Sequence, residues 1–179
     1  ILSSLQSVGV TLILAILISM VVLLVFFGDI KASIIVGSSM PISLLATFLM
    51  MKAMGFSLNI ITMGGLVIGV GMMVDNSIVV LESCFQLRRE QKNLSFKEAA
   101  LAGAKAVSSS ILASTITTCV VFLPIALTAG LSGQMFKPLG FTIVFALTAS
   151  LVSALMVVPL TFAVYKPKEK INLVTNRFM

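Results

Sequence analysis

The sequence predicts an all-α protein, a polytopic bundle of transmembrane helices, and its composition supports this in three ways. Of the 179 residues, 59% are hydrophobic, only 10% are charged, and the mean hydropathy is +1.17. A soluble domain carries about 25% charged residues and could not bury so much apolar surface. These counts exclude a water-soluble enzyme and a disordered chain, and they leave a membrane protein that lies in a lipid bilayer.

Five apolar stretches are each long enough to cross a bilayer, which takes about 20 residues in a helix. Breaks occur around Gly28, around Gly55, between 82 and 105, and between 130 and 138. No alternating barrel pattern is present, and backbone groups in lipid must be satisfied locally, so the spans must be helices. The expected spans are approximately 8–27, 32–51, 58–81, 106–127 and 139–164.

The polar stretch between the third and fourth spans contains a helix start signal. Ser95 is followed three residues later by Glu98, the pattern of a capping box. We therefore expect a short helix over approximately 96–103 along the cytoplasmic surface, most simply as a connector that shields apolar residues at the interface.

The basic residues predict the orientation of the chain. Joining the spans in order places Lys52 and Lys137 on one side and the remaining ten on the other. Short loops rich in Lys and Arg lie in the cytoplasm, so the N-terminus is expected outside and the C-terminus inside. The ten are Lys31, Arg88, Arg89, Lys92, Lys97, Lys105, Lys166, Lys168, Lys170 and Arg177.

The same balance of charge bears on partners and cofactors. The net charge of +6 is explained by basic loops, so we do not expect nucleic acid as a partner. The chain has no His, and Cys84 and Cys119 lie far apart, so we expect no metal site, no disulfide framework and no cofactor. Because the sequence begins with Ile1 and no signal peptide precedes the first span, we expect a longer chain with an earlier span.

Asp75 is the residue that the composition does not explain. It lies six residues, or about 9 Å, before the expected cytoplasmic end of the third span at 81, with apolar residues on both sides and well inside the hydrocarbon core of the bilayer. A carboxylate at that depth costs at least ~2.5 kcal/mol, so it needs a partner, a wet cavity or a proton. If its surroundings alternate, it binds and releases a proton, which is the physical requirement for a proton-coupled transporter. The alternative is an Asp that is permanently protonated or bonded to a neighbouring helix as a structural contact.

Helical spacing assigns the neighbours of Asp75 to two faces of the third span. Glu82 shares the face of Asp75, with Ile68, Gly71, Met72, Ile78 and Val79. Glu82 is a candidate for the mouth of a proton path; the simpler alternative is an interfacial acid that faces water. Gly65, Gly69, Asn76 and Ser83 lie on a neighbouring face.

Gly65 and Gly69 form a small-xxx-small pattern, which lets another helix pack closely, and we expect that helix against the side that carries the acid. Asn76 cannot titrate near neutral pH, so we assign it an orienting role. Ser110, Ser114 and Thr117 in the fourth span either pack against neighbouring helices or line a wet seam.

Several segments together resemble one family of transporters. The resemblance covers nearly the whole chain in order and spacing, and it rests on residues 55–63 (GFSLNIITM), 69–82 (GVGMMVDNSIVVLE), 95–103 (SFKEAALAG), 122–125 (FLPI), and the ending Thr142-Ile-Val with Pro159-Leu. These segments resemble the resistance-nodulation-division (RND) efflux transporters, most closely the hydrophobe/amphiphile efflux branch. The resemblance implies twelve spans in two related halves, with large external domains, and places this chain at spans two to six.

The resemblance also implies site residues and partners. It places Asp75 and Asn76 at the proton relay, facing a Lys and other polar groups of the second half, with protons as the coupling ion. Asn76 departs from the pattern of two adjacent acids. The implied partners are the second half and the external domains of the same chain, together with a homotrimeric arrangement and a periplasmic adaptor protein. The implied location is the bacterial inner membrane.

The sequence therefore predicts a membrane-domain portion of a proton-motive-force-driven multidrug or amphiphile exporter, a secondary active transporter and not an enzyme. A subunit of the SecD/SecF type, which aids protein export, is the alternative within the superfamily. An intramembrane aspartyl protease would need two carboxylates on two helices, and this chain has one mid-span acid. A passive channel is the remaining alternative.

Overall fold

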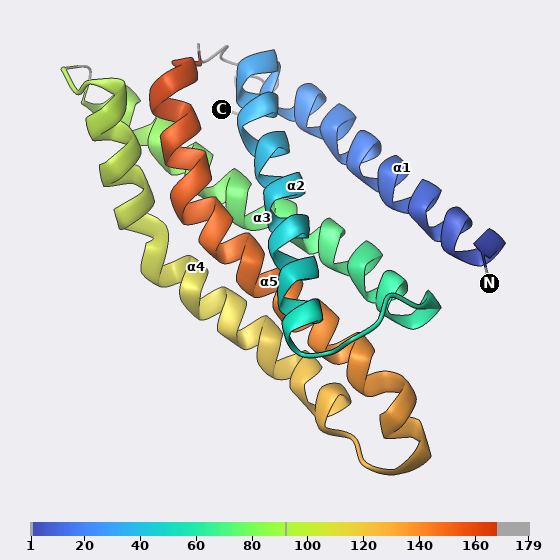
Figure 1. Ribbon diagram of the computed structural model, residues 1–179. Coiled ribbons are helices and arrows are strands. Elements are labelled where there is room, and N and C mark those ends of the chain that lie inside the picture. The colour runs from blue at the N-terminus through green and yellow to red at the C-terminus, as the bar shows by residue number, and fades with distance from the viewer. Residues whose placement is uncertain (1, 92, 168–179) are drawn as a thin grey trace, which may run out of the picture.

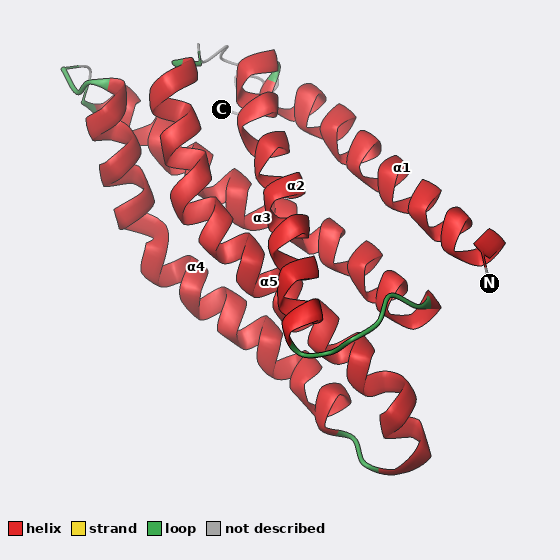
Figure 2. Ribbon diagram, viewed as in Figure 1, coloured by secondary structure: helices red, strands yellow, loops and turns green. Residues whose placement is uncertain are grey.

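The computed structural model describes residues 2–91 and 93–167, and this part of the chain is helical with short connections (Figures 1 and 2). No strand occurs among the described residues, which confirms the all-α prediction. The helices are α1 (Leu2–Phe27), α2 (Ile30–Ala53), α3 (Ile60–Glu90), α4 (Phe96–Leu127) and α5 (Gly130–Tyr165).

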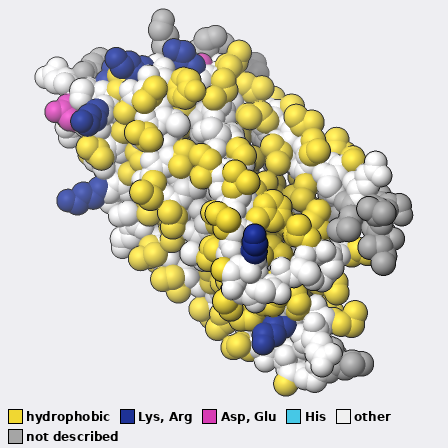
Figure 3. All heavy atoms as spheres, in the orientation of Figure 1, with side chains coloured by type: hydrophobic (Ala, Val, Ile, Leu, Met, Phe, Trp, Pro, Cys, Tyr) yellow, Lys and Arg dark blue, Asp and Glu magenta, His cyan; other side chains and the backbone are white. Residues whose placement is uncertain are grey.

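The helices have the length and composition of a transmembrane bundle. α2, α3, α4 and the Gly133–Tyr165 part of α5 are each long and apolar enough to cross a bilayer. In α1 the described apolar stretch, Gly9–Val25, is shorter. Figure 3 shows apolar side chains over the middle of the visible face, which is the surface expected to meet lipid.

Successive helices run in opposite directions, so their connections gather at two ends of the bundle (Figure 1). The α1–α2 and α3–α4 connections lie at the same end as the C-terminus of α5, where the Lys31 ammonium donates a hydrogen bond to the Tyr165 carbonyl at 3.2 Å. The α2–α3 and α4–α5 connections lie at the other end. α3 packs against each of the other four helices, whereas α1 packs only against α2 and α3.

This arrangement separates the described basic residues as the sequence predicted. Lys52 and Lys137 lie near the α2–α3 and α4–α5 end. Lys31, Arg88, Arg89, Lys97, Lys105 and Lys166 belong to the opposite end or to the α4 turns next to it. Lys92, Lys168, Lys170 and Arg177, which also entered the prediction, lie outside the described residues.

The predicted capping box is confirmed at the start of α4. The Ser95 hydroxyl accepts the Glu98 backbone N–H at 3.2 Å, and the Glu98 carboxylate accepts the Ser95 backbone N–H at 2.9 Å. Asn59 and Thr62 form an equivalent box at the start of α3, which the sequence analysis did not identify. Both boxes satisfy backbone donors that a helix N-terminus leaves free.

The structure differs from the prediction at the boundaries of the last two helices. Residues 96–103 do not form a separate connector; they are the first turns of one continuous helix, α4. Gly103 is not a break but a contact point: a Cβ built there would lie 2.8 Å from Cys84 Cα of α3. Residues 130–138, predicted as a loop, form the first turns of α5, which continues through Pro138. α3 continues to Glu90, past the third expected membrane span of 58–81, which gave the residues that cross the bilayer and not the end of the helix.

Glycines bring α3 into close contact with two neighbouring helices. A Cβ added to Gly69 would lie 2.7 Å from Ala146 Cβ of α5, and one added to Gly65 would lie 3.2 Å from the Leu139 carbonyl oxygen. Gly103 gives the same close approach between α4 and α3. Because backbones approach this closely, van der Waals contact can hold the helices together where lipid supplies no hydrophobic drive.

We expect Gly103→Ala to lower the free energy of unfolding by about 1–3 kcal/mol, because the new methyl group meets backbone atoms of Cys84 that cannot move aside. Thermal unfolding of the intact protein in detergent measures the change. Gly64→Ala is the matched control: nothing lies within 4 Å of a Cβ at that position, so it should leave stability unchanged or raise it by up to about 1 kcal/mol. Equal effects of the two substitutions would contradict this account of the α3–α4 contact.

Candidate functional site

Asp75 lies at the middle of α3 on a side that no described helix covers. Its side chain is exposed, and so are Ile68, Gly71, Val79 and Glu82 on the same stripe. These are members of the face that helical spacing predicted for the acid. The described helices therefore pack on the opposite side of α3 and leave the Asp75 carboxylate on an exposed surface.

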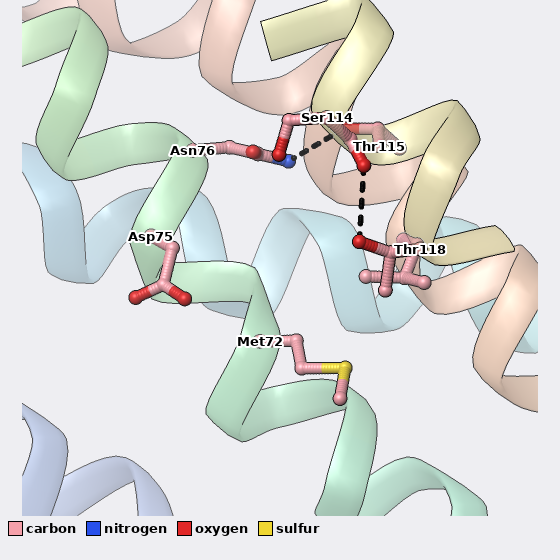
Figure 4. Close-up of a pocket in the computed structure, with 7 residues that line it drawn as sticks. Met72, Asp75, Asn76, Ser114, Thr115 and Thr118 are labelled. Carbon is pink, nitrogen blue, oxygen red and sulfur yellow. Dashed lines mark hydrogen bonds between the residues drawn. The ribbon is translucent and has the colours of Figure 1, made fainter. Parts of the chain in front are cut away.

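Asn76, the next residue, points in a different direction. Its side chain is half-buried and its amide donates to the Thr115 hydroxyl of α4 at 3.3 Å. Figure 4 shows Asn76 directed toward Ser114 and Thr115, while the Asp75 carboxylate points away from them. Successive residues of a helix point about 100° apart. Asn76 therefore hydrogen-bonds to α4, whereas the Asp75 side chain makes no contact of this kind with the described neighbouring helices.

A pocket of about 190 Å³ lies beside these two residues. One water molecule needs about 10–15 Å³ of such volume, so the pocket has room for several. Three helices line it, and apart from Asp75 none of its lining side chains carries a charge: Met72, Asp75, Asn76, Ser114, Thr115, Thr118 and Leu147. The pocket offers hydroxyl and amide groups that can hydrogen-bond water close to the carboxylate.

The other predicted site residues fall on two different sides of α3. Glu82 is exposed on the Asp75 stripe, about two turns nearer the basic end. Gly65 and Gly69 face α5, where they contact Leu139 and Ala146. The helix that packs on the glycines therefore does not cover the acid, contrary to the expectation that one partner would lie against that side.

The α4 hydroxyls that line the pocket are only partly the ones that the sequence analysis named. Of the three named residues, Ser114 lines the pocket, Ser110 is exposed, and Thr117 donates to the Ala113 carbonyl of its own helix at 2.9 Å. Thr115 and Thr118 line the pocket instead. With Ile111 they follow a spacing of four and three residues, a helical stripe that periodicity alone could have indicated.

The sequence analysis also missed a buried group of serines behind Asp75. Ser39 of α2, Ser77 of α3, and Ser150 and Ser153 of α5 are all at most 4% exposed. Ser39 and Ser77 hydroxyls lie 2.8 Å apart, and Ser150 donates to the Met73 carbonyl at 2.9 Å. The signal for this group was the run Ser39, Ser43 and Thr47, three polar residues four apart within an apolar span.

The described residues around this site contain neither a candidate metal-ligand cluster nor a disulfide. Among residues 2–91 and 93–167, no three His, Cys, Asp or Glu side chains lie close enough to hold a metal ion. Cys84 and Cys119 are both free thiols. The chemistry available around Asp75 is therefore that of one carboxyl group among neutral hydrogen-bonding groups.

Comparison with known proteins identifies the relatives of this chain. A family model described as the AcrB/AcrD/AcrF family matches residues 1–174. The swarming motility protein SwrC of Bacillus subtilis (strain 168) is 40% identical over 143 residues, which are 79% of this chain and 14% of that protein. The multidrug resistance protein MdtC of Escherichia coli (strain K12 / DH10B) is 33% identical over 175 residues, 96% of this chain and 17% of that protein. MdtC of Yersinia pestis is 35% identical over 161 residues, 90% of this chain and 16% of that protein.

The chain thus spans 14 to 17% of the length of these relatives. The family match covers nearly every residue, including the helix that carries Asp75 and the hydroxyl-lined pocket beside it. On this basis the chain belongs to the AcrB/AcrD/AcrF family, that is, to the resistance-nodulation-division (RND) efflux transporters.

Proposed function

We propose that this chain is part of the membrane domain of a proton-motive-force-driven exporter, and that Asp75 is its proton carrier. One observation carries the proposal: a single carboxyl group lies mid-helix on an open face, beside a pocket of about 190 Å³ lined by hydroxyl and amide groups. Family membership indicates a transporter and not a conventional enzyme. The secondary active mechanism, antiport of protons against substrate, is our inference.

The proposed cycle uses the difference between two environments of one carboxyl group. A carboxyl group that faces water or a cation is stable as the anion, whereas one packed against apolar groups is stable only with a proton. Proton uptake from outside and release inside then alternate the packing of α3 against its partner. One charge that crosses 100 mV supplies ~2.3 kcal/mol, enough to bias states that differ by a few kcal/mol.

Asn76 and Glu82 have supporting roles in this proposal. Asn76 cannot carry a proton at neutral pH, and its bond to Thr115 ties α3 to α4, so it orients the site. Glu82 lies on the same exposed stripe toward the basic end, where it would be the mouth of the proton path.

The open stripe on α3 indicates what must complete the site. Ile68, Val79 and their neighbours present apolar surface around Asp75, with no described helix against it. We propose that the remainder of a longer chain, the second half of the membrane domain, covers this stripe. External domains that select the substrate, a homotrimer and a periplasmic adaptor are further proposed partners, in a bacterial inner membrane.

The nature of the substrate rests on the relatives alone. Two of them are named multidrug resistance proteins and one a swarming motility protein. We propose amphiphilic compounds as the substrate class. A passive channel, which needs no titrating group, is the alternative from a different class, and a protein-export subunit of the SecD/SecF type is the alternative among proton-coupled systems.

We expect Asp75→Asn to reduce export to the level of cells without the protein, because an amide cannot take up and release a proton. The measurement is efflux of a fluorescent amphiphile that the wild-type protein exports, with the amount of inserted protein checked by immunoblot. Glu90→Gln is the matched control, the same chemical change at the exposed end of the same helix, and it should export normally.

Two results would contradict the carrier role. The first is normal export by Asp75→Asn. The second is wild-type export that continues after a protonophore has collapsed the proton gradient, which would favour the passive channel.

The proposed orientation is tested by labelling single cysteines with a membrane-impermeant maleimide. With Cys84 and Cys119 replaced by Ala, we expect Lys137→Cys to react in intact cells and Lys97→Cys to react only after the cells are opened, because these residues lie toward opposite ends of the bundle. The reverse pattern would place the basic end outside and refute the orientation.

A further inference from the structure

Three of the four buried serines behind Asp75 differ from most hydroxyls of the bundle in what they bond. Most hydroxyls within these helices donate to their own backbone three or four residues earlier, as Ser43 and Thr47 do in α2. Ser77, Ser150 and Ser153 instead reach other helices. These bonds connect α2, α3 and α5 at one level of the bundle.

The direction of the Ser39–Ser77 bond follows from counting protons. The Ser39 hydroxyl has one proton, and it donates to the Val36 carbonyl of its own helix at 2.6 Å. Ser77 is therefore the donor to Ser39 across their 2.8 Å separation. The carbonyl that Ser77 would otherwise use within α3, that of Met73, accepts Ser150 of α5 at 2.9 Å. The two contacts therefore form one arrangement, in which each helix depends on the other two.

These contacts lie on the side of α3 opposite Asp75. Ser77 is two residues after Asp75 and Met73 is two residues before it, so each is rotated about 160–200° from the carboxylate. Any rotation of α3 that changes what Asp75 faces must break the bond to Ser39, the bond from Ser150, or both. In contrast, Gly65 and Gly69 contact α5 without directional bonds, so these contacts oppose a rotation of α3 only weakly.

We propose that Ser39, Ser77 and Ser150 form a latch that fixes the rotation of α3 and thereby sets the surroundings of Asp75. They are positioning residues of the proton carrier, and the inference rests on the function proposed for Asp75. Ser153, which donates to the Ser39 carbonyl at 3.2 Å, ties the α2 side of the latch to α5. Because each hydroxyl has an alternative acceptor on its own helix, the latch can open without leaving a buried donor unpaired.

No other charged group within the described bundle lies against Asp75. The helices that pack on α3 carry their charges near their ends, and α1 carries none: Lys31 and Lys52 on α2, Lys97, Glu98 and Lys105 on α4, and Lys137 on α5. α3 itself carries Glu82, Arg88, Arg89 and Glu90, all toward its C-terminal end, and the thiols on these helices are Cys84 and Cys119. A change in the titration of Asp75 on loss of the latch would thus report its own repositioning.

The test follows the Asp75 carboxyl by infrared spectroscopy during a pH titration of the intact, full-length protein, with Asp75→Asn used to assign its band. We expect Ser77→Ala and Ser150→Ala each to shift the titration midpoint by up to roughly 0.5–1 pH unit, because each removes one hydrogen bond from the latch and the free energy of that bond limits how far a change in the rotation of α3 can move the midpoint. Ser43→Ala is the matched control: Ser43 is just as buried, but its hydroxyl bonds only its own helix, and it should shift the midpoint by less than roughly 0.2 unit.

Each outcome decides the question. A midpoint unchanged in both Ser77→Ala and Ser150→Ala overturns the latch, as does an equal shift in Ser43→Ala, because general loss of packing would then explain the effect. Using both substitutions keeps the test valid if either variant does not fold. A wild-type carboxyl that does not titrate at all overturns the proposed function of Asp75 and the latch with it, which separates that failure from failure of the latch alone.

Discussion

A carboxyl group in the middle of an apolar helix is the constraint on which the rest of this structure depends. The bilayer core supplies neither water nor counter-ions, so every polar group there must find its partner within the protein. Among the polar side chains near the middle of α3, Asp75 is the one with no hydrogen-bond partner among the described residues; its neighbours Asn76 and Ser77 both have one. The bundle satisfies the polar groups on either side of the acid and leaves the acid itself available.

Neutral hydroxyls and glycines build the support for that arrangement. Gly65, Gly69 and Gly103 allow the backbones of α5 and α4 to approach α3 closely, which brings serine and threonine side chains within reach of each other. Interhelical hydrogen bonds in membranes contribute only about 0.6–2 kcal/mol each, so no single bond locks the bundle. Bonds of this size are compatible with the change in packing of α3 that the proposed function requires.

The helices could be predicted from the sequence because runs of apolar residues leave no alternative structure in lipid. The helix ends could not be predicted, because Gly103 and Pro138 are helix breakers by propensity but lie inside α4 and α5, and at Gly103 the lack of a side chain serves the close contact with Cys84 of α3. The stripe of Asp75 and Glu82 follows from periodicity, since apolar residues flank both acids. The face of α4 that lines the pocket could not be predicted in the same way. Residues 108–118 carry hydroxyls around most of the helix, and periodicity cannot distinguish between faces of similar polarity.

If Asp75 is the proton carrier, the amide at Asn76 beside it limits the energy that this site could draw from the membrane potential. Two carboxyl groups that both titrate could move two charges per cycle, about 4.6 kcal/mol across 100 mV, whereas one moves half of that. Asn76, the second polar residue of the pair, is hydrogen-bonded to Thr115 of α4 and carries no titrating group. If Asp75 is the carrier, each cycle moves one charge through this site, and a steeper substrate gradient requires a larger membrane potential or a further acid in the part of the protein that covers the stripe.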